Sequence, residues 1–200
     1  SPAISKGDTQ MKRFLMLLSA ASLLVVVSGA SFAQFGSGEI TPPEKGTAEV
    51  SLGLNAQLMS PSDISLQLSY APYLNRNLQV GGQLSYYRAD GSGSDPDYTQ
   101  WGLGATATYN FVAPEGPVSR MIPYAGIGLG YVKADAGDWD DDATMWTVFG
   151  GVKQFISEDV ALYGQLAWSK ASEEIYRDGE KDELRLMVGL STYLKMGKAE

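Results

Sequence analysis

Apolar and polar residues alternate one by one along most of the chain after residue 45. A period of two predicts β-strands that turn one face to an apolar medium and the other to polar surroundings. Eight such runs follow one another, and no helical period interrupts them. Their apolar positions begin at Val50, Ile64, Leu78, Trp101, Pro123, Trp146, Val160 and Leu184.

The length of these runs favours a membrane-spanning barrel. Each is longer than the usual globular strand of about 5–6 residues and is close to the ~9–11 residues that a tilted strand needs to cross a bilayer. Aromatic residues stand at both ends of the apolar faces, as rings at a membrane interface do. One predicted girdle holds Tyr86, Trp101, Tyr131, Trp146 and Trp168, and the other holds Tyr70, Tyr109 and Phe111. The predicted fold is all-β, an eight-stranded antiparallel up-and-down transmembrane β-barrel.

The polar faces of the runs predict the barrel interior. They carry many amides, among them Gln67, Gln79, Gln83, Gln100 and Gln165. Glu49 and Lys153 fall near one end of the predicted strands and Arg185 near the other, and an unpaired charge there would cost several kcal/mol. We therefore expect a buried ion pair between Glu49 and Lys153. The favoured interpretation is a static plug, and the alternative is a gate that switches partners and admits ions.

The chain before the barrel has the pattern of a cleaved signal peptide. Basic Lys12 and Arg13 precede an apolar stretch from Phe14 to Val27, and small residues lead to a cleavage site after Ala33. The predicted organisation is an upstream extension (1–10), a signal peptide (11–33), a periplasmic lead-in (34–45), the barrel (46–194) and a C-terminal tail (195–200).

The connections between the runs predict an orientation. Three long connections (88–99, 133–143 and 171–182) fall at one end, and short turns such as 75–77 and 157–159 fall at the other. Because external loops are longer than periplasmic turns in such barrels, both termini are expected in the periplasm. The long connections are acidic, and the densest run offers a weak candidate cation site at Asp138, Asp140, Asp141 and Asp142. A solvated acidic loop is the favoured interpretation of that run.

Several segments resemble the small eight-stranded outer-membrane β-barrel proteins of Gram-negative bacteria, the OmpA/OmpX-like family. The similarity rests on the hairpins Tyr73 to Leu78 and Phe155 to Val160 and on the strand Pro123 to Tyr131. It implies location in the outer membrane, contact with lipid and lipopolysaccharide, insertion by the barrel-assembly machinery and a monomeric state. One departure is that Tyr193 and Leu194 are followed by a tail from Lys195 to Glu200, whereas the family usually ends on an aromatic residue.

Composition narrows the function further. The chain has no His and no Cys, which excludes thiol chemistry, disulfides, Cys/His zinc sites and His-based catalysis. Barrel enzymes that act on lipid A depend on a His. The formal net charge of −8 argues against a nucleic-acid partner. We expect a non-enzymatic barrel without a cofactor, with a structural or surface-interaction role through its acidic loops. The alternative is a narrow channel or a small-ligand transporter.

Overall fold

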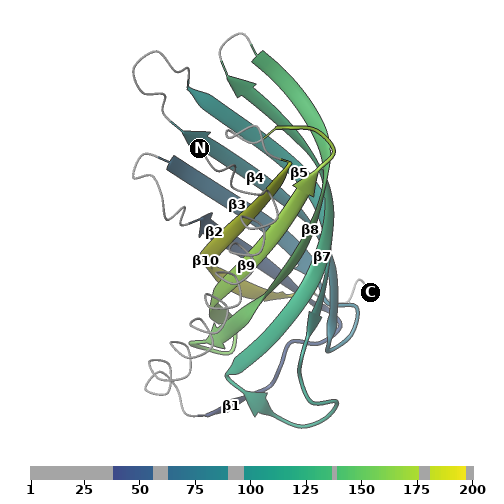
Figure 1. Ribbon diagram of the computed structural model, residues 1–200. Coiled ribbons are helices and arrows are strands. Elements are labelled where there is room, and N and C mark those ends of the chain that lie inside the picture. The colour runs from purple at the N-terminus through teal and green to yellow at the C-terminus, as the bar shows by residue number, and fades with distance from the viewer. Residues whose placement is uncertain (1–37, 56–62, 90–96, 137–138, 176–180, 197–200) are drawn as a thin grey trace, which may run out of the picture. The chain divides into compact units, whose positions relative to one another are not determined.

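The computed structural model describes residues 38–55, 63–89, 97–136, 139–175 and 181–196 (Figure 1). The predicted signal peptide and the extension before it lie outside these residues. Strands dominate the part of the chain that is described. No helix in that part is long and apolar enough to span a membrane.

Eight strands form a closed antiparallel barrel in which chain neighbours pair and the last strand closes against the first. At this seam Leu190 lies opposite Leu52. The eight-stranded barrel predicted from the alternation is confirmed. Its strands are β2 (Thr47–Asn55), β3 (Asp63–Pro72), β4 (Leu78–Ala89), β5 (Tyr98–Asn110), β7 (Met121–Ala136), β8 (Trp139–Phe155), β9 (Val160–Ala171) and β10 (Asp182–Lys195).

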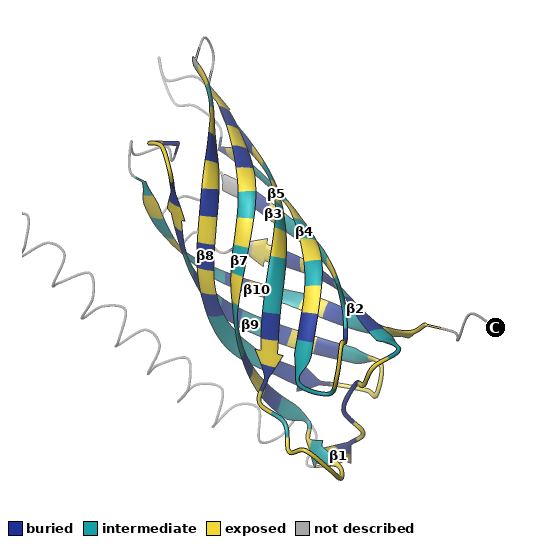
Figure 2. Cartoon of the chain, turned by 90° about the vertical axis from the view of Figure 1, so that its right-hand side faces the viewer, coloured by how far each residue is buried: buried dark blue, intermediate teal, exposed yellow. Residues whose placement is uncertain are grey.

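The apolar face of the barrel points outward. Buried and exposed residues alternate as bands along the strands in Figure 2, most clearly on β7 and β8. Leu103, Ile127 and Leu129 are each 62% exposed, whereas Thr147 and Gln165 point inward and are buried. A barrel that is soluble in water would show the reverse pattern, because its apolar residues would fill the core. The exterior is therefore suited to lipid.

The barrel has two unlike ends. The end where β2 begins and β10 finishes is here called the turn end, and it holds the connections after β3, β5 and β8. The opposite end is called the loop end. At the turn end, β1 (Glu39–Ile40) pairs with β6 (Val118–Ser119) in a separate two-stranded sheet. This pairing explains why the connection between β5 and β7 is longer than the other turns at that end.

The predicted long loop at 133–143 is wrong. Strands β7 and β8 continue into it as a paired hairpin, with Lys133 opposite Asp142 and Ala136 opposite Trp139. Backbone pairing does not require apolar side chains once a strand has left the membrane, so the ladder extends where the alternation of apolar residues has ended. Asp140, Asp141 and Asp142 of the acidic run therefore belong to β8 and pair with β7.

Candidate functional site

A buried lysine is the centre of the polar network inside the barrel. Lys153 on β8 is 4% exposed. Its Nζ atom donates to Oε2 of Glu49 at 2.6 Å, to Oε1 of Gln79 at 3.1 Å and to Oδ1 of Asn110 at 3.1 Å. An ammonium group has three protons, so these three acceptors satisfy it completely. The same atom lies 4.9 Å from the centre of the Tyr124 ring.

Both oxygens of the Glu49 carboxylate also accept hydrogen bonds. Its Oε2 atom also accepts from Nε2 of Gln79 at 2.7 Å, and its Oε1 atom accepts from Oγ of Ser191 at 2.7 Å. Asn110 completes the network by donating from Nδ2 to Oε1 of Gln79 at 2.9 Å. The five side chains come from β2, β4, β5, β8 and β10, so a single network joins strands from around the whole barrel.

The alternation of inward and outward side chains explains why these five residues come together. Glu49, Gln79, Asn110, Lys153 and Ser191 all occupy inward positions near the turn end. The sequence predicted the two charged residues as a pair and placed Gln79 on the polar face, but it gave no role to Gln79, Asn110 or Ser191. The strand starts in the sequence indicate that these residues lie at a similar depth in the barrel. Which amide contacts which charge depends on strand tilt and register.

Arg185 does not belong to this network. Its Nε atom lies 2.8 Å from Oε2 of Glu183, two positions earlier on β10, and the two side chains are 14% and 20% exposed. Residues two apart on a strand share a face, so the sequence contained the signal for this pair. Glu183 was nevertheless not among the predicted interior charges.

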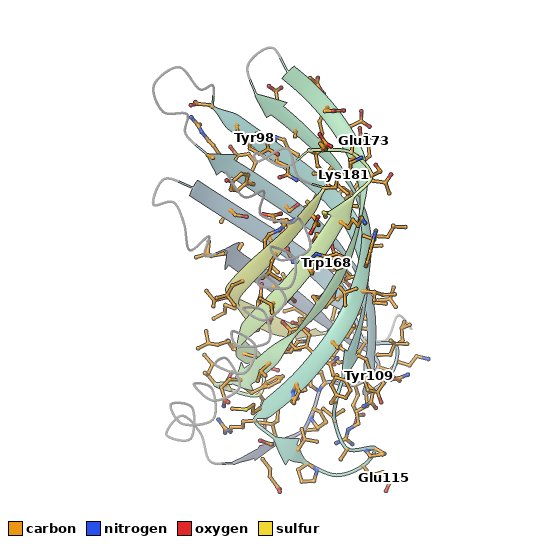
Figure 3. All side chains as sticks on the ribbon, viewed as in Figure 1. Tyr98, Tyr109, Glu115, Trp168, Glu173 and Lys181 are labelled. Atoms are coloured by element: carbon orange, nitrogen blue, oxygen red, sulfur yellow. The ribbon has the colours of Figure 1, made fainter. Side chains whose placement is uncertain are left out.

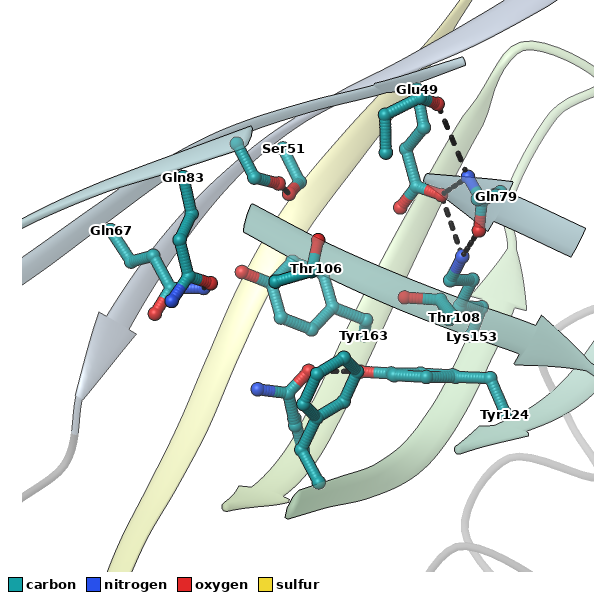
Figure 4. A pocket seen from close by; sticks show the side chains of 14 residues that line it. Glu49, Ser51, Gln67, Gln79, Gln83, Thr106, Thr108, Tyr124, Lys153 and Tyr163 are labelled. Atoms are coloured by element: carbon teal, nitrogen blue, oxygen red, sulfur yellow. Dashed lines mark hydrogen bonds and ion pairs between the residues drawn. The ribbon is translucent and has the colours of Figure 1, made fainter. Parts of the chain in front are cut away.

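A small polar cavity lies next to the Glu49–Lys153 pair (Figure 4). Its volume is about 50 Å³, which is room for roughly three or four water molecules. The labelled side chains in Figure 4 enclose it with hydroxyls, amides and aromatic rings. Its lining includes Ser51, Gln67, Gln83, Thr106, Thr108 and Tyr163.

Interior glycines make room for aromatic rings. A Cβ atom added at Gly126 would collide with the Phe149 ring, and one added at Gly189 would collide with the Tyr163 ring. Tyr124 occupies the space over Gly151 in the same way, and its hydroxyl donates to Oε1 of Gln165 at 3.1 Å. In the structure, rings fill the space above these three glycines.

Apolar clusters lie inside the barrel at both ends. Their buried members interrupt the polar interior that the sequence predicts. The turn-end cluster holds Ile40, Tyr73, Ile122, Phe155, Ala161 and Tyr193. The loop-end cluster holds Ala89, Tyr98, Val132, Ala134, Ala143, Met145, Ala171 and Ile175. Ile175 is fully buried there, and the Tyr98 hydroxyl donates to its carbonyl oxygen.

The residues of the predicted aromatic girdles lie on the outside of the barrel. Ring centres are 4.5 Å apart for Tyr86 and Trp101, and 4.8 Å apart for Trp146 and Trp168. Tyr131 is also exposed, on the same side of the apolar band. Toward the turn end, the exposed rings are those of Tyr70, Tyr109 and Phe111.

Acidic residues line the loop end. Figure 3 places Glu173 and Lys181 toward this end, and Tyr109 and Glu115 toward the other. In the predicted cation site, Oδ2 of Asp140 lies 2.8 Å from Nζ of Lys133, and the register pairs Asp140 with Asp135 and Asp142 with Lys133. Asp138 lies outside the described residues. Within the described ranges, no group of three or more potential metal ligands comes together.

Solved structures of outer-membrane proteins share this architecture. The N-terminal β-barrel domain of Pseudomonas aeruginosa OprF matches with a TM-score of 0.55 and 17% identity, over 76% of this chain and 100% of that one. Neisserial surface protein A matches with a TM-score of 0.52 and 19% identity, over 74% and 94%. OprG from Pseudomonas aeruginosa matches with a TM-score of 0.52 and 13% identity, over 78% and 99%.

The chain has the fold of the small eight-stranded outer-membrane β-barrels. No family model matches its sequence, and no curated relative matches it. At these identities the likeness concerns the fold. Function must therefore be argued from the interior and the rims of this chain's own barrel.

Proposed function

We propose that this protein is a non-enzymatic, non-conducting barrel of the outer membrane. Its surface role belongs to the acidic β7–β8 hairpin and the acidic segment after β9, which the barrel holds at the cell surface. The observation that carries the proposal is the fully matched network around Lys153. Its three donors and the Glu49 carboxylate find partners within the barrel wall. The charges of this network are neutralised by each other and do not attract an ion. Moving Glu49 and Lys153 apart would leave a charge buried without a partner.

The ends of the barrel support the same function. Apolar side chains lie inside it on both sides of the polar layer, at the turn end and at the loop end. An ion that crosses the barrel would have to shed its water to pass two apolar clusters. Eight strands also enclose only enough space for side chains or one small ligand.

The rims support the location and the orientation. The outward apolar band with aromatic rings at both edges matches a bilayer. The extended β7–β8 hairpin and the segment after β9 carry carboxylates at the loop end, which we assign to the cell surface. The two termini then lie on the periplasmic side. Since rigid scaffolds commonly display interaction sites on their connections, we assign the surface role to these acidic structures.

A small-ligand transporter is the second candidate, and the cavity of about 50 Å³ favours it. Neutral amides and hydroxyls such as those of Gln67, Gln83 and Thr106 would suit a small polar solute. Liposome swelling separates the two candidates. Vesicles that contain the refolded chain should swell no faster in urea or glycerol than protein-free vesicles, whereas a general porin assayed in parallel should produce rapid swelling. Swelling that depends on the chain would favour the transporter and overturn the proposal.

The orientation has its own test, because the chain has no cysteine of its own. Glu174→Cys places a single thiol at the loop end, and Glu158→Cys places one at the turn end, both at exposed positions. A membrane-impermeant thiol reagent added to intact cells should label the first variant and spare the second. Labelling of the second variant alone would reverse the assigned orientation.

A further inference from the structure

The segment that precedes the first barrel strand enters the turn end of the barrel. Ile40 on β1 is 3% exposed, and its partners in the turn-end cluster are inward residues of four strands: Ile122 of β7, Phe155 of β8, Ala161 of β9 and Tyr193 of β10. Pro42 and Pro43 are buried as well. An apolar side chain from outside the barrel wall thus occupies its opening.

This cluster lies directly against the polar network. Tyr193 is opposite Glu49 across the barrel seam, and Ile122 is opposite Lys153 between β7 and β8. All four side chains point inward and are buried. Ile40 and its neighbours therefore stand between the buried ion pair and the water on that side of the membrane.

The strand pairing of this segment is short in comparison with that of a barrel strand. Strand β1 pairs with β6 through only two residue pairs, Glu39 with Ser119 and Ile40 with Val118. Gly46 separates the segment from β2 and has a φ of 93°, a conformation that glycine adopts without the strain other residues incur. Short two-stranded ladders open more readily than the central strands of a sheet.

We propose that residues 38–45 form a detachable plug, with Gly46 as its hinge, which covers and uncovers the turn end while the barrel stays folded. Release of the plug exposes the apolar floor under the Glu49–Lys153 pair to periplasmic water. The inference depends on the proposed orientation only in naming the periplasm as the side to which the turn end opens. The movement itself depends on the contacts of Ile40.

Thiol labelling of the refolded chain in lipid vesicles tests the movement. Ile40→Cys reports undocking, Glu39→Cys reports an exposed neighbour, and Ala134→Cys reports a fully buried site in the loop-end cluster. A small water-soluble reagent should label position 40 at least about tenfold more slowly than position 39 and at least about tenfold faster than position 134. A rate equal to that at position 134 would mean that the segment opens only when the barrel unfolds. A rate equal to that at position 39 would mean that it is not docked. Either result overturns the plug.

A second reporter tests whether the segment covers the opening. Ala161 is fully buried in the turn-end cluster. Ala161→Cys should label at least about tenfold faster when combined with Ile40→Ser, whereas Ala134→Cys should not respond to Ile40→Ser. Equal labelling of Ala161→Cys with and without Ile40→Ser overturns the plug. Swelling of vesicles by the wild-type chain would instead overturn the proposed function, so the two proposals can fail separately.

Discussion

Nζ of Lys153 lies 2.6 Å from Oε2 of Glu49, although 104 positions separate the two residues in the chain. The pair is buried, with side chains 5% and 8% exposed. It links β8 to β2, the strand that closes the barrel against β10. Because Ser191 on β10 donates to the same carboxylate, the pair also ties the two sides of the seam.

Removal of one partner of this pair should destabilise the barrel. Lys153→Met leaves the Glu49 carboxylate buried without its cation, and the expected loss is about 3–5 kcal/mol. Urea unfolding of the refolded chain in detergent micelles, followed by tryptophan fluorescence, measures it.

The matched control is the double variant Glu49→Gln with Lys153→Met, which removes both charges. It should recover much of the stability, because no unpaired charge remains. Glu49→Gln alone completes the comparison. A double variant whose loss equals the sum of the losses of Lys153→Met and Glu49→Gln would show that the two charges do not act as a pair.

The second prediction concerns the interior glycines, above which aromatic rings are packed. Gly126→Ala introduces a Cβ atom into the Phe149 ring, and overpacking of this kind costs about 1–3 kcal/mol. Gly150→Ala is the control, since the nearest atom to its added Cβ is the Tyr124 carbonyl oxygen at 3.6 Å. The same unfolding assay should show a loss for the first variant and little change for the second. Phe149→Leu should rescue only part of the loss, because the added Cβ atom also lies 2.6 Å from the carbonyl oxygen of Ala107. No rescue at all would contradict the contact with the ring as a cause of the loss.

The outward apolar face provides a third prediction. Ile127 is 62% exposed at the middle of β7, and Ile127→Arg should destabilise the barrel in lipid vesicles by about 2–4 kcal/mol. Leu74→Arg changes an exposed leucine in the turn after β3 and should have almost no effect. Equal effects of the two substitutions would mean that Ile127 does not face the hydrocarbon of the bilayer.

The sequence predicted the barrel well because the alternation of apolar residues is a local property. Positions such as Leu103, Ile127 and Leu129 display it without reference to any other strand, and the structure shows them exposed. The same principle failed at the tip of the β7–β8 hairpin, where Asp135 lies opposite Asp140. Strand pairing continues there although the side chains carry no apolar signal.

The candidate site was only partly predictable. Burial of a charge makes a partner necessary, so Glu49 and Lys153 could be paired from the sequence. The roles of Gln79, Asn110 and Ser191 depend on strand register. The position of Ile40 depends on a contact between the lead-in and the far side of the barrel, and an isolated isoleucine in a polar segment gives no sign of it.

The mobility of the refolded chain on a gel tests the central claim, a closed barrel whose apolar face points outward, most directly. Residues 34–200 would be refolded in detergent micelles and run with and without boiling. A closed barrel resists the detergent, so the unheated sample should migrate differently from the boiled one, and the chain should require detergent to stay in solution. No difference in mobility, together with a soluble monomer in buffer alone, would contradict the account, because the apolar face would then point inward.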